Sequence, residues 1–103
     1  MGMTLPPFEI AWDATKAQSN IAKHGVTFAQ AATVLLDPLA LTVFDAGHSQ
    51  QEARWFTLGQ SSEGQLLAVA HTWRDTTTSI QVRLISAREA TRGEREQYQQ
   101  QPR

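Results

Sequence analysis

Four segments rich in β-branched and aromatic residues follow one another between residues 39 and 86, with turn residues between them. They are LALTVF at 39–44, RWFTLGQ at 54–60, QLLAVAHTW at 65–73 and SIQVRLIS at 79–86. Such segments are typical of β-strands. The connections SSEG and RDTTT are short enough for hairpins, which join antiparallel strands. The last three strands are therefore predicted to form an antiparallel meander.

The segment before residue 39 predicts a strand followed by a helix. FEIAW at 8–12 alternates large apolar residues with Glu9 and Ala11, as a half-buried strand does. Asp13 suits a helix N-cap, and Gly25 suits the left-handed position that ends a helix. The apolar stripe between them consists mainly of alanines, so this helix is expected to lie flat against a sheet with small side chains inward.

Two further helices are predicted, one at 28–36 and one at the end of the chain. Thr27 followed by Gln30 is a capping-box pattern, and the dipeptide DP after the helix ends it. The segment 87–100 predicts a C-terminal helix despite Gly93, which costs about 1 kcal/mol relative to alanine.

These elements predict one α+β domain over residues 8–100, with flexible termini at 1–7 and 101–103. The order β-α-α-β-β-β-β-α implies a mainly antiparallel sheet with the two N-terminal helices on one face and a C-terminal helix that closes the domain.

Composition excludes several kinds of site. The chain has no cysteine, which excludes disulfides, a thiolate nucleophile and cysteine-rich zinc sites. The histidines lack metal-ligand spacing and the glycines form no phosphate-loop or dinucleotide motif, so no metal or cofactor is expected. No apolar run approaches the roughly 18 residues of a membrane span, and the first residues lack the charged start and apolar centre of a signal peptide. The sequence therefore predicts a cytoplasmic protein without membrane contact.

Cationic side chains gather in the segment QVRLISAREATRGEREQY at 81–98, although the net charge is −1. Arg83, on a predicted strand, is costly to bury unless a partner or an anion satisfies it. Arg88 falls at the predicted helix start, where backbone N–H groups favour negative charge. Together with Arg54, these arginines are expected to hold a phosphate through charge-assisted hydrogen bonds.

Arg92 and Arg95 have a second interpretation, because glutamates at helical spacing would pair with them on a solvated face. Direct DNA recognition by this helix is a weaker hypothesis, since the interspersed glutamates repel phosphates. His71 is a candidate proton donor or acceptor near neutral pH; the alternative is a partly buried histidine hydrogen-bonded to its surroundings. His24 suits a helix end, and His48 a solvated loop.

The blocks KHGVTF, DPLAL, AHTWR and ISAREAT, in this order and spacing, resemble the BrnT toxins of bacterial BrnT–BrnA toxin–antitoxin pairs over about residues 8–98. The resemblance implies a RelE-like fold, a cytoplasmic ribonuclease that blocks translation, and neutralisation by a BrnA-like antitoxin. It also implies a 2:2 complex in which a ribbon-helix-helix antitoxin makes the DNA contacts and represses the operon.

Cleavage of RNA without a metal requires a deprotonated 2′-hydroxyl, a stabilised phosphorane and a protonated leaving oxygen. The candidate catalytic residues are Arg54, Arg83, Arg88, His71 and Glu52, with the arginines on the phosphate and His71 or Glu52 moving the proton. The candidate RNA-binding residues are Arg92, Arg95, Tyr98 and Lys23, with Tyr98 stacking on a base or relaying a proton.

Three positions depart from the family pattern. Glu89 and Gly93 stand where the resembling family usually has basic residues, and Trp73 stands where a glutamate is common. The loss of two positive charges lowers the expected affinity for RNA. The alternative function is therefore a catalytically weak or silent binding module that acts through its antitoxin in operon autoregulation.

Overall fold

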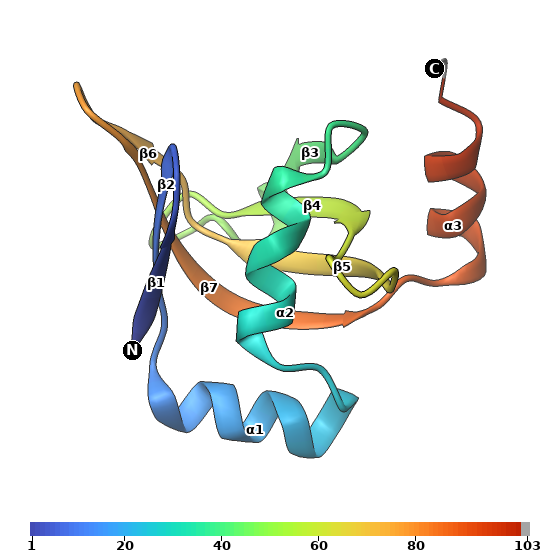
Figure 1. Cartoon of the computed structure of the whole chain (residues 1–103), viewed down its shortest axis with the longest axis horizontal. Helices are drawn as coiled ribbons and strands as arrows, with labels where there is room; N and C mark the ends of the chain where they lie inside the picture. The colour runs from blue at the N-terminus through green and yellow to red at the C-terminus, as the bar shows by residue number, and fades with distance from the viewer. Residues whose placement is uncertain (102–103) are drawn as a thin grey trace.

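One twisted sheet, in the strand order β1-β2-β7-β5-β4-β3, organises the molecule (Figure 1). The computed structural model describes residues 1–101. The strands are β1 (Gly2–Leu5), β2 (Phe8–Ala11), β3 (Leu41–Phe44), β4 (Trp55–Gln60), β5 (Leu66–His71), β6 (Arg74–Asp75) and β7 (Ile80–Glu89). β2 runs parallel to β7, and the other pairings in the described part of the chain are antiparallel, so the sheet is mixed.

Three α-helices complete the described residues: α1 (Ala14–His24), α2 (Phe28–Thr33) and α3 (Arg92–Gln99). The α+β class is confirmed, and the caps form as predicted. The Asp13 side chain accepts from the Lys16 N–H, and Gly25 closes α1 with a φ of 69°. Thr27 caps α2. The predicted helix at 28–36 changes at its end to a 3₁₀ turn, η1 (Val34–Leu36), and a second 3₁₀ turn, η2 (Ala46–His48), lies in the polar loop.

The ends of the predicted domain need correction. Residues 1–7 were expected to be a flexible terminus, but Gly2–Leu5 form β1 and pair with β2. At the other end, Gln101 donates a hydrogen bond to the Leu39 carbonyl (2.8 Å). Residues 102–103 of the second expected flexible terminus lie outside the described part of the chain.

The start of the C-terminal helix also differs from the prediction. Ala87 and Arg88 do not begin a helix; they continue β7, because they pair with Val69 and Ala68 of β5. The helix starts only after Thr91, which forms a full capping box with Glu94.

The two faces of the sheet have different coverings. On the helix side, α1, α2 and η1 cover a core made of Phe8, Ile10, Val26, Phe28, Ala31, Ala32, Val34, Leu67, Val69, Val82, Leu84 and Ala87. On the opposite face, here called the outer face, α3 covers one end through a smaller core of Leu58, Leu66, Ala68 and Tyr98. Figure 1 shows α3 at the far end of the sheet from β1 and β2. The rest of the outer face is thus left for other contacts.

α1 lies at the edge of β7 that β2 leaves unpaired. β2 pairs with β7 only as far as Arg83. Beyond that point the buried Asn20 of α1 takes the place of a strand: its amide donates to the Ala87 carbonyl (2.8 Å) and accepts from the Ala87 N–H (3.0 Å). It also donates to the Val26 carbonyl (2.9 Å). These bonds fix the polar side of α1 next to the outer face.

Candidate functional site

Strand alternation places Arg54, Arg83 and Arg88 on the outer face of the sheet. Arg83 lies between two residues that are buried in the helix-side core. Arg88 is paired with Ala68, which packs in the outer core. Arg54 alternates with Phe56, which lines a hollow beside α3. The predicted phosphate-binding arginines therefore share one face.

The same arginines do not converge on one pocket. Arg83 lines a hollow of about 630 Å³ together with Glu52 and Trp73. Arg54 lines two other hollows, one against α1 and one against the loop that precedes β4. Arg88 is bonded to Glu94 instead. The expectation that all three hold one phosphate is therefore corrected, while Arg54 and Arg83 remain neighbours through Glu52.

Glu52 lies at the centre of a cationic cluster. Its carboxylate accepts a hydrogen bond from the Arg83 guanidinium, and the pair is partly open to solvent. This bond is the main reason that the pKa of Glu52 is lowered; desolvation opposes it, and the charges of Arg83, Arg54 and Lys16 lower the pKa further. Glu52 is therefore ionised at neutral pH, with Arg83 bonded to it and Arg54 lining the same hollow.

A third basic position is supplied by α1. A hollow of about 280 Å³ is lined by Lys16, Ser19, Asn20, Lys23, His24, Arg54, Ile85 and Ser86. Lys23 was predicted to bind RNA, whereas Lys16, Ser19 and Ser86 were not identified from the sequence. The sequence does contain a pattern that could have identified this polar surface of α1. Its residues have the spacing of one helix face: Lys16, Ser19, Asn20 and Lys23.

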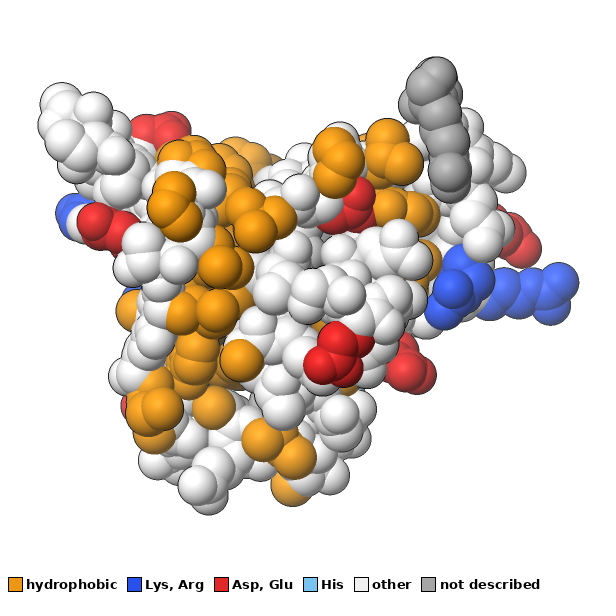
Figure 2. Space-filling model, viewed as in Figure 1, with side chains coloured by type: hydrophobic (Ala, Val, Ile, Leu, Met, Phe, Trp, Pro, Cys, Tyr) orange, Lys and Arg blue, Asp and Glu red, His pale blue; other side chains and the backbone are white. Residues whose placement is uncertain are grey.

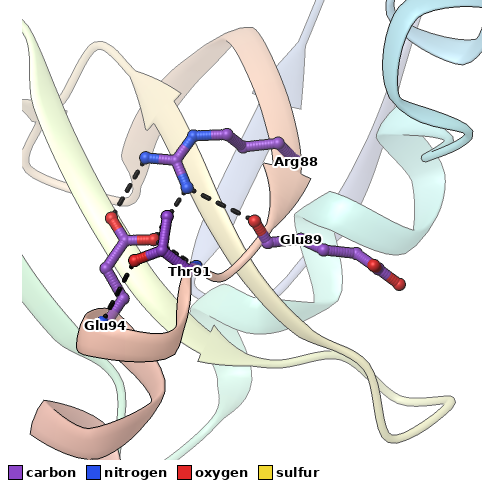
Figure 3. A network of polar contacts seen from close by, with 4 residues as sticks. All are labelled: Arg88, Glu89, Thr91 and Glu94. Carbon is purple, nitrogen blue, oxygen red and sulfur yellow. Dashed lines mark hydrogen bonds and ion pairs between the residues drawn. The ribbon is translucent and has the colours of Figure 1, made fainter.

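Arg88 holds the corner between β7 and α3 (Figure 3). Its Nη1 and Nη2 atoms bond the two carboxylate oxygens of Glu94 at 2.7 and 3.0 Å, and Nη1 also reaches the Glu89 carbonyl. The hydrogen bond to Arg88 is the main cause that lowers the pKa of Glu94 to about 2, and the same bond raises the pKa of Arg88. A guanidinium engaged in this way acts as a structural tie rather than as a free anion ligand.

The comparisons with known proteins give the family. A model of the family described as "Ribonuclease toxin, BrnT, of type II toxin-antitoxin system" matches residues 12–94. The chain belongs to the BrnT family. Among solved structures, the ribonuclease toxin BrnT of Brucella abortus aligns with a TM-score of 0.55 and 27% identity, over 81% of this chain and 96% of the other. No curated protein sequence gave a significant match.

His71 of this BrnT family member is buried on the helix side, with an exposed fraction of 0%. Its Nδ1 bonds the Thr72 carbonyl (2.8 Å), so Nδ1 carries a proton and Nε2 of the neutral ring accepts from the Thr57 hydroxyl (2.6 Å). Burial is the main cause that lowers the pKa of His71. The predicted role as proton donor or acceptor is not supported by this position; the buried, hydrogen-bonded alternative describes it.

The residues of α3 divide into an anchor and a solvated face. Tyr98 is buried in the outer core and its hydroxyl donates to the Asp37 carboxylate, so its ring is not presented for base stacking. Arg92 and Arg95 are exposed, and the Nε atom of Arg92 lies 3.5 Å from the Oε1 atom of Glu96. Figure 2 shows cationic side chains gathered over α3. The solvated-face interpretation therefore fits α3.

Other binding chemistry has little support in the described part of the chain. Among residues 1–101, no group of three or more histidine, aspartate and glutamate side chains is arranged to hold a metal ion. Within the same range, none of the helices combines the length and apolar character that crossing a bilayer requires.

Proposed function

We propose that this protein is a metal-independent endoribonuclease with a RelE-like fold, which cleaves RNA on its outer face and thereby blocks translation in the cytoplasm. The observation that supports this most directly is the ion pair between Arg83 and Glu52, with Arg54 in the same hollow as Glu52. Membership in a ribonuclease toxin family gives the reaction class. The cluster supplies cations for the phosphate and a carboxylate for the proton.

In the proposed reaction the substrate replaces an internal ion pair. The scissile phosphate binds the Arg83 guanidinium in place of Glu52, and Arg54 binds it from the other side of the carboxylate. The freed Glu52 then accepts the proton of the ribose 2′-hydroxyl as that oxygen attacks phosphorus and the bond to the 5′-oxygen breaks. The leaving 5′-oxygen takes a proton from solvent water, and the products are a 2′,3′-cyclic phosphate and a 5′-hydroxyl. The guanidinium groups stabilise the negative charge that develops on the phosphorane oxygens.

The proposal includes a protein partner. A type II toxin is controlled by an antitoxin, and the family description names such a system. We propose a BrnA-like ribbon-helix-helix antitoxin, a 2:2 complex, and DNA contacts made through the antitoxin.

The structure also gives one observation in favour of the alternative, a catalytically silent binding module. Both Arg83 and Arg88 are paired with carboxylates, and His71 is buried. A site whose cations are already neutralised binds a phosphate only by breaking those pairs. A module of this kind would act through its antitoxin in autoregulation, without cutting RNA.

Cleavage of a purified RNA separates the two functions. We expect the wild-type protein to cut the RNA in the presence of a chelator, and we expect Glu52→Gln and Arg83→Gln each to lower the rate by about 100-fold or more. Arg95→Gln is the charge-matched control, because Arg95 is exposed on α3 and is outside the hollow that Glu52 and Arg83 line. Equal rates in wild type and both cluster variants would reject this site; no cleavage and no growth arrest would favour the silent module.

A further inference from the structure

The hollow between α1 and the outer edge of β7 has the chemistry of an anion site. The charged side chains that line it are Lys16, Lys23 and Arg54, and the imidazole of His24 also lines the hollow. Its neutral lining includes the hydroxyl groups of Ser19 and Ser86. No aspartate or glutamate is among these lining residues. The lysine and arginine side chains in the hollow thus favour a negative ligand.

Arg54 carries the second observation. Its Nε atom is buried and has no hydrogen-bond partner among the described residues. A buried donor that is left unbonded destabilises the protein, and the effect is larger when the group is charged. Arg54 lines the hollow, so an anion bound there would supply an oxygen acceptor to its guanidinium group. Arg54 differs in this respect from Arg83 and Arg88, whose guanidinium groups already have carboxylate partners.

Buried contacts fix the position of α1, so the lysines of this helix that line the hollow stay next to it. Asn20 lies between Lys16 and Lys23 on the same side of α1, and its amide is bonded to the backbone of Ala87 and Val26. Three hydrogen bonds on one buried side chain prevent the helix from rotating away from the edge of β7. Lys16 and Lys23 must therefore project on either side of this anchor, toward the hollow that both line.

We propose that this hollow is a phosphate subsite of the RNA-binding face, which holds a phosphodiester next to the scissile one. The proposal rests on the proposed ribonuclease function and places the two phosphates on either side of Arg54. Arg54 lines both this hollow and the neighbouring one that contains Glu52. At about 280 Å³ the hollow is at the small end of ligand sites, which suits a phosphate group rather than a base with its sugar.

Recognition at this subsite would be independent of base sequence. The lining offers ammonium, guanidinium and hydroxyl groups, which bind phosphate oxygens and position the chain without reading base edges. Its consequence is a preference for substrate length: an RNA with a flanking phosphate binds more tightly than a dinucleotide with the scissile phosphate alone.

Titration with inorganic phosphate, followed by amide chemical shifts, tests the subsite without any cleavage. We expect wild-type shifts at residues of α1 and at Ser86, and a loss of affinity of about 10-fold or more in Arg54→Gln and in the double variant Lys16→Gln/Lys23→Gln. Arg95→Gln, which removes one positive charge on the exposed side of α3, should bind phosphate as wild type does. Unchanged spectra outside the hollow show that each variant is folded. Affinity that is equal in all four proteins, or shifts confined to other surfaces, would overturn the subsite.

A kinetic comparison separates this proposal from the ribonuclease proposal. Lys16→Gln/Lys23→Gln should raise KM for a long RNA by about 10-fold while it changes KM for a dinucleoside monophosphate much less. An equal change for both substrates would contradict the subsite. A different outcome is also informative: the protein could bind phosphate through Arg54 and yet cleave no RNA. That result would support the anion site and contradict the ribonuclease proposal.

Discussion

The side-chain amide of Asn20 and the backbone of Ala87, 67 residues apart in the chain, form a reciprocal pair of hydrogen bonds. Asn20→Ala would leave the N–H and C=O of Ala87 and the carbonyl of Val26 without this partner in a buried site. We expect the free energy of unfolding to fall by about 2–4 kcal/mol, measured by urea denaturation. Gln18→Ala, on the exposed side of α1, should stay within about 0.5 kcal/mol of wild type. A cost below 1 kcal/mol for Asn20→Ala would mean that α1 is held by other contacts.

Gly93→Ala should stabilise the protein by about 0.4–1 kcal/mol, because alanine restricts the unfolded chain and favours the helix. A Cβ at position 93 meets no atom within 4 Å. Gly59→Ala is the matched opposite case: its Cβ would lie 3.1 Å from the Val34 carbonyl oxygen and 3.2 Å from the Ala40 Cβ. That variant should be destabilised by about 1–3 kcal/mol. Thermal unfolding of both variants measures these changes. If Gly93→Ala were destabilised, the conclusion that α3 has room for a Cβ at position 93 would be wrong.

Stability is expected to decrease as the pH falls below about 6.5, the ordinary pKa of the His71 side chain. Burial lowers the pKa of His71 in the folded state, so the unfolded chain binds a proton more readily than the folded protein does. Acid therefore favours the unfolded state and lowers the free energy of unfolding. Denaturation at pH 7.5 and 5.5 measures the effect. His71→Gln should be less stable than wild type at pH 7.5 but should lose less stability between the two pH values. An equal loss in both proteins would assign the acid sensitivity to other groups.

The bond between Arg88 and Glu94 should support the docking of α3 by about 1 kcal/mol, since both side chains are partly exposed. The pKa of Glu94 is lowered to about 2, so this stabilisation is present above about pH 4.5 and is lost as the pH falls toward 2. Glu94→Gln should show the loss at pH 7 in chemical denaturation. Glu96→Gln, which affects the looser pair with Arg92, should change stability by less than about 0.5 kcal/mol.

Local signals predicted much of the fold. Asp13, Thr27 and Gly25 are capping residues whose roles depend on neighbours within four positions, and the structure uses all three as expected. The misplaced start of the third helix has a different cause. Ala87 and Arg88 have side chains that suit a helix, but their backbone groups pair with β5, and such long-range pairing overrides local preference. β1 was missed for the same reason, since its four residues become a strand only beside β2.

The candidate site was predicted less completely than the fold. Strand alternation grouped Arg54 with Phe56 and Arg83 with Ile85, but the sequence does not show which strand faces coincide or which carboxylate pairs with which arginine. The buried side of α1 was also misjudged. An apolar stripe was expected to face the sheet, yet Ile21 is 48% exposed and the polar Asn20 is buried, because an unpaired strand edge needs hydrogen bonds more than apolar contact.

The parallel pairing of β2 with β7 joins Phe8 to Ile80 and Ala11 to Arg83. A nascent chain therefore cannot close its sheet until residues 80–83 have left the ribosome, and contacts of such high order form slowly. Arg83 belongs to β7, so the ion pair with Glu52 forms only after this strand has joined the sheet.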